Sequence, residues 1–155
     1  MQKIHCIGIG GIGISALARY FLSEGYRVSG SDAVDSDLLH ELKSEGMVIT
    51  VGHKAGNVPP DAFLVIYSPA VQKDNPEFQT AKEYALPLQS YPEALGELTR
   101  RYTTIAVSGS HGKSTTTSLV ALLLTAAKLD PTVIVGTKLR EFGGNVASLT
   151  DVQLN

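Results

Sequence analysis

Residues 3–13 read Lys-Ile-His-Cys-Ile-Gly-Ile-Gly-Gly-Ile-Gly, an apolar run that leads directly into a glycine cluster. The first seven of these residues predict a short buried strand, and the apolar spacing that follows predicts a helix. Within the cluster, Gly8, Gly10 and Gly13 match the pattern G-x-G-x-x-G. At a strand–helix junction this pattern is typical of a loop that binds the pyrophosphate of a nucleotide.

Each glycine of the pattern has a physical role in such a loop. We expect Gly8 to permit the tight turn, Gly10 to let the backbone approach a pyrophosphate, and Gly13 to let the helix pack close to the strand. The free N–H groups at the helix start can then hold phosphate without a cation. Asp32 lies 22 residues beyond Gly10, where an acid that holds a ribose hydroxyl is expected. The motif does not distinguish NAD, FAD and a UDP-sugar as the ligand. The alternative interpretation is a glycine turn that binds no ligand.

A second glycine loop begins at Ser108 and reads Ser-Gly-Ser-His-Gly-Lys-Ser-Thr. It ends like a phosphate loop but is shorter than the usual G-x-x-x-x-G-K-[ST]. Its physical parts predict a site for ATP and Mg²⁺: Lys113 can neutralise β/γ oxygens, and the Ser114 hydroxyl can ligate the metal. The predicted ATP-binding residues are Gly109, Ser110, His111, Gly112, Lys113, Ser114 and Thr115, with Lys113 as the catalytic residue. The alternative to a phosphate-binding loop is an ordinary helix N-terminus rich in Ser and Thr.

On both sides of each glycine loop, predicted apolar strands alternate with predicted helices along the chain. This alternation predicts an α/β fold with a parallel sheet. We expect a Rossmann-like sheet with flanking helices, followed by the first strand–P-loop–helix–strand unit of a P-loop ATPase domain. The expected strands are 3–9, 26–30, 47–51, 63–67, 86–88, 103–107 and 131–135. The expected helices are 12–24, 37–45 (capped by Ser36), 74–84 (capped by Asp74), 90–100 (with a capping box) and 113–128, and the remainder is expected to be irregular.

Composition narrows the class of protein. The 155 residues carry a net charge of -2, which argues against a nucleic-acid-coating protein. One cysteine excludes an internal disulfide framework. No signal peptide or membrane span is expected, so we expect a cytoplasmic protein. Residues 1–100 have a net charge of -4 and residues 101–155 one of +2, which predicts a boundary near residue 100, with a UDP-sugar-binding domain before it and the start of an ATP-binding domain after it.

Several weaker candidates lie at the predicted ligand-binding edge of the sheet. His53 follows the third strand, and its position is equally consistent with contact to a ligand and with a purely structural role. Ser68 and Ala70 follow the fourth strand at the same edge. His5 and Cys6, inside the first strand, are expected in the core.

Two nucleotide loops about 100 residues apart resemble one family, the Mur ligases, and in particular the N-terminal part of the member that adds L-alanine to UDP-N-acetylmuramate. The matching stretches are 5–13, 28–32 (Val-Ser-Gly-Ser-Asp), 68–71 (Ser-Pro-Ala-Val), 74–77 (Asp-Asn-Pro-Glu) and 109–117. The murein-peptide ligase, which attaches a recycled tripeptide to the same sugar nucleotide, is a close cousin and stays open as an alternative.

The resemblance implies a ligase of peptidoglycan precursor synthesis with three domains, which bind UDP-N-acetylmuramate, Mg-ATP and the amino acid. The reaction would pass through an acyl phosphate on the lactyl carboxylate of the sugar. On this chain, Gly8, Gly10, Gly11, Ile12 and Gly13 would meet the pyrophosphate, and Ser31, Asp32 and His53 would lie near the uridine. Ser68 and Ala70 would line the floor of the site, and Lys113 would stabilise the γ-phosphoryl group.

Family members are about three times as long as this chain, and no acidic cluster that would complete the Mg²⁺ site follows the second loop. We therefore expect no alanine ligation by this polypeptide alone. Because the helix of residues 113–128 has a broad apolar surface, we also expect either that the second segment exchanges its amide hydrogens faster than the first or that the protein self-associates through it. Three rivals remain. A nicotinamide-dependent oxidoreductase leaves the second loop unexplained, a small P-loop phosphotransferase gives the first hundred residues no role, and a non-catalytic nucleotide-binding fragment explains both loops.

Overall fold

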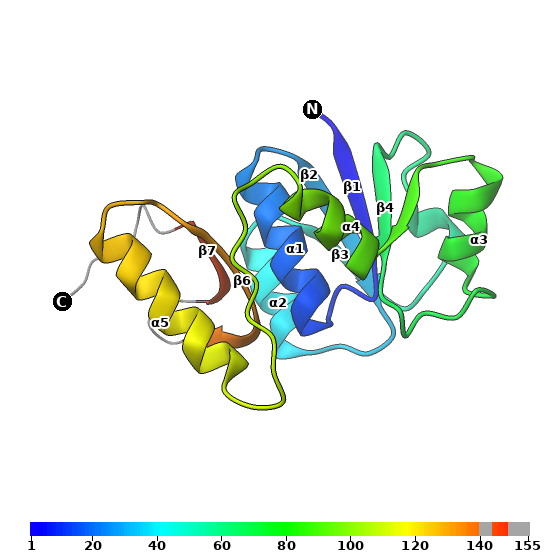
Figure 1. The fold of residues 1–155 in the computed structure, drawn as a ribbon. Helices are drawn as coiled ribbons and strands as arrows, with labels where there is room; N and C mark the ends of the chain where they lie inside the picture. Colours follow the sequence, from blue (N-terminus) through cyan, green and yellow to red (C-terminus); the bar gives the residue numbers. More distant parts are fainter. Residues whose placement is uncertain (140–143, 149–155) are drawn as a thin grey trace. The chain divides into compact units, whose positions relative to one another are not determined.

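The computed structural model describes residues 1–139 and 144–148, and the chain divides into two compact units, Met1–Tyr102 and Thr103–Asn155. In the first unit, five strands form one parallel sheet in the order β3-β2-β1-β4-β5 (Figure 1). The strands are β1 (Lys3–Ile7), β2 (Arg27–Asp32), β3 (Val48–Val51), β4 (Leu64–Tyr67) and β5 (Leu88–Ser90). The predicted Rossmann-like parallel sheet is confirmed.

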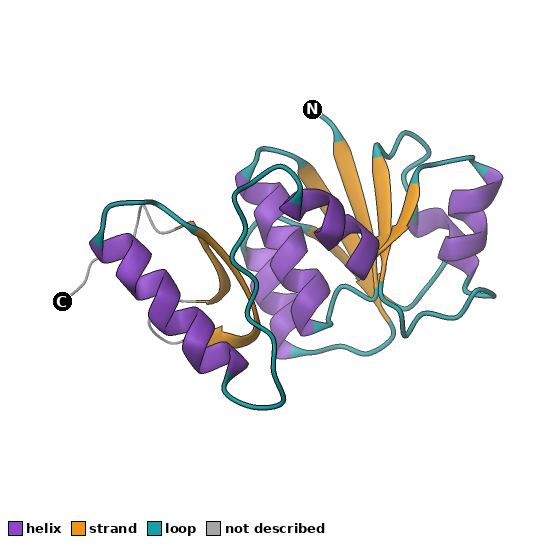
Figure 2. Ribbon diagram, viewed as in Figure 1, coloured by secondary structure: helices purple, strands orange, loops and turns teal. Residues whose placement is uncertain are grey.

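Helices cover both faces of this sheet (Figure 2). They are α1 (Ile12–Ser23), α2 (Asp37–Ser44), α3 (Pro76–Glu83) and α4 (Tyr91–Thr99), with a short 3-10 turn η1 (Ala55–Asn57) before β4. In Figure 1, α1, α2 and α4 lie on one side of the sheet and α3 on the other. Right-handed crossovers place α1 and α2 on one face and α3 on the other, because the chain moves in opposite directions from the central pair β1 and β4.

The core lies on both faces of β1, because alternate side chains of a strand point to opposite faces of the sheet and helices cover both faces. Ile4 and Cys6 face one way and Ile7 the other, and all three side chains are fully buried. On the α3 face, Ile7 packs in a cluster with Val58, Ala62, Val65, Phe78 and Ala81. The sheet order reverses between β1 and β4, so the loops that follow these two strands open a crevice at the carboxyl edge.

Caps set the starts of the helices. Ser36 caps α2, as predicted, and accepts a hydrogen bond from the N–H of Leu39 at 3.4 Å. At α3 the predicted cap, Asp74, is wrong by one residue: Asn75 Oδ1 accepts from the N–H groups of Glu77 and Phe78. Proline at the next position, Pro76, fixes the first helical residue and so selects Asn75 as the cap.

The second unit contains α5 (Lys113–Ala126) and an antiparallel pair, β6 (Thr132–Leu139) and β7 (Gly144–Ser148). Two expectations are wrong here. Residues 103–107 do not form a strand, since no strand in the described part of the chain lies beside them to complete a ladder. The stretch after residue 135 is not wholly irregular, because β7 pairs with β6. Among the described residues, no helix has the length and apolar character needed to cross a membrane.

Candidate functional site

The turn that leaves β1 depends on Gly8. Its φ of +80° lies in the left-handed region, and a Cβ there would stand 2.9 Å from Cβ of Ser68. The N–H groups of Gly8 and Ile9 both donate to the carbonyl of Ser31, at 2.8 and 2.9 Å. The loop is therefore fastened to the end of β2, and it is brought against the loop that follows β4.

Gly10 faces Asp32, the acid at the end of β2. The N–H of Gly10 donates to Asp32 Oδ2 at 2.8 Å, and a Cβ on Gly10 would lie 2.8 Å from the same oxygen. The immediate reason for glycine at this position is thus the close approach of a carboxylate. The predicted contact between Gly10 and a pyrophosphate stays a prediction.

Gly13 packs against a neighbour that the sequence pattern did not indicate. A Cβ at Gly13 would lie 2.8 Å from Cζ of Tyr91, at the start of α4. Glycine therefore lets α1 approach α4, whereas the predicted role of Gly13 was close packing of α1 on the strand. Neither Gly13 nor Ile12 lines the cleft described next.

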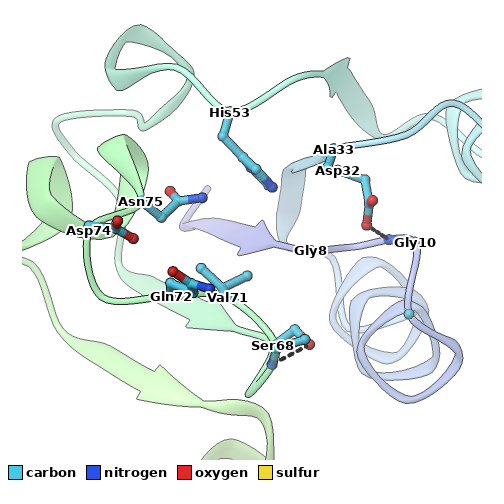
Figure 3. Close-up of a pocket in the computed structure, with 12 residues that line it drawn as sticks. Gly8, Gly10, Asp32, Ala33, His53, Ser68, Val71, Gln72, Asp74 and Asn75 are labelled. Carbon is cyan, nitrogen blue, oxygen red and sulfur yellow. Dashed lines mark hydrogen bonds between the residues drawn. The ribbon is translucent and has the colours of Figure 1, made fainter.

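A cleft of about 510 Å³ opens at the carboxyl edge, between the loops that follow β1, β2, β3 and β4 (Figure 3). It is lined by seven of the predicted substrate-binding residues: Gly8, Gly10, Gly11, Asp32, His53, Ser68 and Ala70. Its size lies within the range of small-molecule sites. Four separate loops therefore bring together residues that are up to 62 positions apart in the sequence.

Five further residues line the cleft that sequence reasoning did not select: Ala33, Val71, Gln72, Asp74 and Asn75. Four of them follow β4 in the segment that begins at Ser68. The position of a residue directly after a strand, at the carboxyl edge of the sheet, was the one feature of the sequence that indicated ligand contact. It holds for the whole segment after β4 and not only for Ser68 and Ala70.

Ser31 lies beneath the cleft rather than in its lining. Its side chain is fully buried, its hydroxyl donates to Glu77 Oε2 at 2.6 Å, and its oxygen is 2.9 Å from Nδ1 of His53. Glu77 is not among the predicted site residues. A glutamate in the first turn of a helix ordinarily complements the helix dipole at the surface, so its sequence position gave no signal of burial.

The second glycine loop is exposed. Residues 108–112 form no regular structure, Gly112 has a φ of +76° at the start of α5, and no side chain caps that helix. Lys113 Nζ donates to the carbonyl of Gly109 at 2.6 Å. The uncapped N–H groups and the adjacent cation suit a phosphate group. Among the described residues, no group of three or more His, Cys, Asp or Glu side chains could hold a metal ion, so the predicted role of Ser114 rests on its hydroxyl alone.

Comparison with known proteins gives consistent matches. A family model described as "Mur ligase family, catalytic domain" matches residues 3–103. A UDP-N-acetylmuramate–L-alanine ligase from Alkaliphilus metalliredigens is 49% identical over 148 residues, which cover 94% of this chain and 32% of that protein. The ligase of the same name from Aquifex aeolicus is 48% identical, again over 94% of this chain and 32% of that protein. The chain thus spans about a third of the length of these relatives.

Solved structures agree with the sequence matches. The UDP-N-acetylmuramate-alanine ligase from Thermotoga maritima superposes with a TM-score of 0.87 at 37% identity, over 94% of this chain and 34% of that one. A UDP-N-acetylmuramate:L-alanyl-gamma-D-glutamyl-meso-diaminopimelate ligase from Neisseria meningitides gives a TM-score of 0.85 at 29% identity, over 94% of this chain and 46% of that one.

Proposed function

Because this chain belongs to the Mur ligase family, we propose that it forms the sugar-nucleotide-binding part, and the beginning of the ATP-binding part, of a cytoplasmic UDP-N-acetylmuramate–L-alanine ligase. The observation that carries the proposal is the cleft built by Gly8, Gly10, Asp32 and His53 at the reversal point of the sheet. Ligands of open parallel sheets bind at such points. Identity of 49% over almost the whole chain to a ligase of that name supports the choice of substrate.

In this function, the glycine loop and the start of α1 would bind the diphosphate of UDP-N-acetylmuramate. α1 begins at Ile12 with Gly11 as its cap residue and without a side-chain cap, and the positive end of its helix dipole favours an anion such as a diphosphate. Asp32 and His53 would contact the nucleoside across the cleft, and Ser68 and Ala70 would form the floor. Asp32 can keep its hydrogen bond from Gly10 while it accepts one from a ribose hydroxyl, because an ionised carboxylate has lone pairs for several donors.

The loop before α5 would receive the phosphates of ATP. ATP with Mg²⁺ supplies the phosphoryl group that activates the lactyl carboxylate as an acyl phosphate, which the amine of alanine then attacks. Lys113 would release its hydrogen bond to Gly109 and neutralise the phosphate oxygens. Ser114 is the one hydroxyl placed by the sequence pattern to meet Mg²⁺, and nucleotide oxygens commonly supply further ligands to this ion.

A second candidate, attachment of a peptide to the same sugar nucleotide, is favoured by the Neisseria structure, which has nearly the same TM-score. Both candidates share the sugar nucleotide and differ in the acceptor. The higher identity to alanine ligases supports alanine. Assay of the whole protein that contains this chain, with alanine and with the tripeptide as acceptors, separates the two.

The decisive experiment measures thermal unfolding of the chain with UDP-N-acetylmuramate, NADH and Mg-ATP, each added alone. A ligand that binds the folded state raises Tm by mass action, by an amount that grows with its concentration. We expect UDP-N-acetylmuramate to raise Tm and NADH to leave it unchanged. Stabilisation by NADH and not by the UDP-sugar contradicts the proposal and supports an oxidoreductase, whereas a response to Mg-ATP alone supports a P-loop phosphotransferase.

A matched pair of variants locates the binding site. Asp32→Asn keeps the shape of the side chain but removes its charge, and it should weaken binding of UDP-N-acetylmuramate by about tenfold, the cost of one charge-assisted hydrogen bond. Asp61→Asn is the control, since Asp61 pairs with Lys3 and does not line the cleft. Equal effects of the two variants would remove the cleft as the binding site.

A further inference from the structure

Glu77 is a fully buried carboxylate at the start of α3, directly beneath the cleft. Its Oε2 accepts hydrogen bonds from His5 Nε2 at 3.0 Å and from the hydroxyl of Ser31 at 2.6 Å. Its Oε1 accepts from the N–H of Lys54 at 3.1 Å and from Asn57 Nδ2 at 2.6 Å. Four donors from three separate segments therefore converge on one side chain.

These bonds determine which nitrogen of His53 carries a proton. An ionised carboxylate can only accept, so the single proton of the Ser31 hydroxyl is committed to Glu77. Ser31 Oγ is also 2.9 Å from Nδ1 of His53, and with its proton committed it can only accept there. Nδ1 must therefore donate. Glu77 Oε1 lies 3.6 Å from the same nitrogen and favours a proton on it as well.

The other ring nitrogen, Nε2, is left for the cleft. Figure 3 shows His53 pointing into the space between Asp32 and Asn75, and His53 lines the cleft with Nδ1 held from below by Ser31. In a neutral ring with the proton on Nδ1, Nε2 presents a lone pair. A nucleoside offers suitable partners, since its ribose hydroxyls and the imide N–H of uracil are donors.

We propose that Glu77 is the positioning residue of His53: through Ser31 it fixes the Nδ1–H tautomer, so that Nε2 faces the cleft as an acceptor for a hydroxyl or imide N–H of the nucleoside. The proposal rests on the nucleotide-binding function proposed for the cleft. Burial by itself would raise the pKa of Glu77, but the hydrogen bonds from His5, Ser31 and Asn57 together lower it. The carboxylate is therefore ionised at neutral pH, as the tautomer argument requires.

Glu77→Gln makes a sharp test because the amide fits in only one orientation. Its NH₂ group cannot take the place of Oε1, where it would face the N–H of Lys54, a backbone donor that cannot reverse. It must take the place of Oε2, beside His5 and Ser31, which can both become acceptors. Ser31 then turns its proton toward His53 Nδ1, and the ring changes to the Nε2–H tautomer. Every group keeps a partner, so the variant should fold.

The tautomer is read from the ¹⁵N chemical shifts of the imidazole nitrogens of His53, at a pH where the ring is neutral and with no ligand present. We expect Nδ1–H in the unmodified chain and Nε2–H in Glu77→Gln. Ser29→Ala is the matched control, because Ser29 contacts His5 on the far side of the same network and should leave His53 as Nδ1–H. Nε2–H in the unmodified chain overturns the proposal without any variant, as does an unchanged tautomer in Glu77→Gln.

Binding of UDP then tests the consequence for recognition. In Glu77→Gln, an N–H faces a ligand donor, so affinity for UDP should fall about tenfold, and Ser29→Ala should leave it unchanged. In a His53→Ala background, Glu77→Gln should cause no further loss, because Glu77 acts through the imidazole. Unchanged or tighter UDP binding by Glu77→Gln overturns the acceptor role of Nε2. If the unmodified chain does not bind UDP, the proposed function of the cleft fails, while the tautomer measurement still decides the role of Glu77.

Discussion

At the scale of single residues, the approach of Asp32 to Gly10 governs the geometry of the glycine loop. A Cβ at residue 10 would lie only 2.8 Å from Oδ2 of this carboxylate, which also holds the loop by a 2.8 Å hydrogen bond. The same carboxylate lines the cleft. Loop shape and ligand contact therefore depend on one side chain.

Gly10→Val should abolish binding of UDP-N-acetylmuramate, with a loss of more than about a hundredfold in affinity. The new side chain would displace the Asp32 carboxylate and break its hydrogen bond, which should lower the free energy of unfolding by about 1–3 kcal/mol. Calorimetric titration and urea unfolding measure the two effects. Binding within a few-fold of the unmodified chain would show that Gly10 does not face the ligand.

Glu77 should make stability depend on acid pH. Its pKa in the folded protein is lower than the 4.5 of the free side chain, so its contribution is fully present above about pH 4.5 and is lost as pH falls through the folded pKa. The groups that face it are His5, Ser31, His53, Asn57 and the N–H of Lys54. In urea unfolding, the difference in free energy between the unmodified chain and Glu77→Gln should shrink below pH 4.5. A difference that stays constant down to pH 3 would contradict this.

At the scale of secondary structure elements, caps and glycine placement explain where most helices begin. In α4, Glu93 Oε2 accepts from the N–H of Ser90 at 2.7 Å, which is the contact expected from the capping-box pattern. Strand formation depends more on neighbours: residues 103–107 have β-forming side chains, yet they lie exposed outside any sheet. Strand propensity requires a paired partner to become a strand.

Gly96 lies inside α4, and nothing stands within 4 Å of the position that a Cβ would take. Gly96→Ala should therefore raise the free energy of unfolding of the first unit by about 0.5–1 kcal/mol, because alanine loses less backbone entropy in a helix. Urea unfolding measures the gain, and binding of UDP-N-acetylmuramate should not change. A loss of stability would mean that α4 is packed more tightly at this point than the structure shows.

At the scale of the whole molecule, the two units differ in how well they bury apolar side chains. The first unit has a core on both faces of its sheet, with Ile4, Ile7 and Leu17 fully buried. In the second unit, α5 buries only Ala121, while Leu119 and Leu123 are 57% and 70% exposed. Because these leucines remain in contact with water, their apolar surface does not contribute to the stability of the second unit.

We therefore expect amide hydrogens of residues 103–135 to exchange much faster than those of β1, β2 and β4, or the chain to self-associate through α5. Hydrogen exchange read by mass spectrometry, together with sedimentation, measures both. Leu123→Lys should suppress any association and leave exchange in the first unit unchanged. Uniformly slow exchange in a demonstrated monomer would show that the second unit is as stable as the first.

The sequence by itself determined the class of fold and the edge of the sheet that carries the cleft. Two local patterns carried this information: apolar runs that alternate with helical spacing, and glycines directly after the first strand. Both involve residues that are neighbours in the sequence, so they can be recognised without the structure. Seven residues predicted from these patterns and from the family resemblance line the cleft. Only the tertiary structure decided that Asp32 lies against Gly10 and that Tyr91 packs against Gly13. Only the tertiary structure, likewise, places Ser31 between His53 and Glu77. These contacts join residues 22 to 78 positions apart, and no local pattern encodes which distant side chains the crossovers of a sheet bring together.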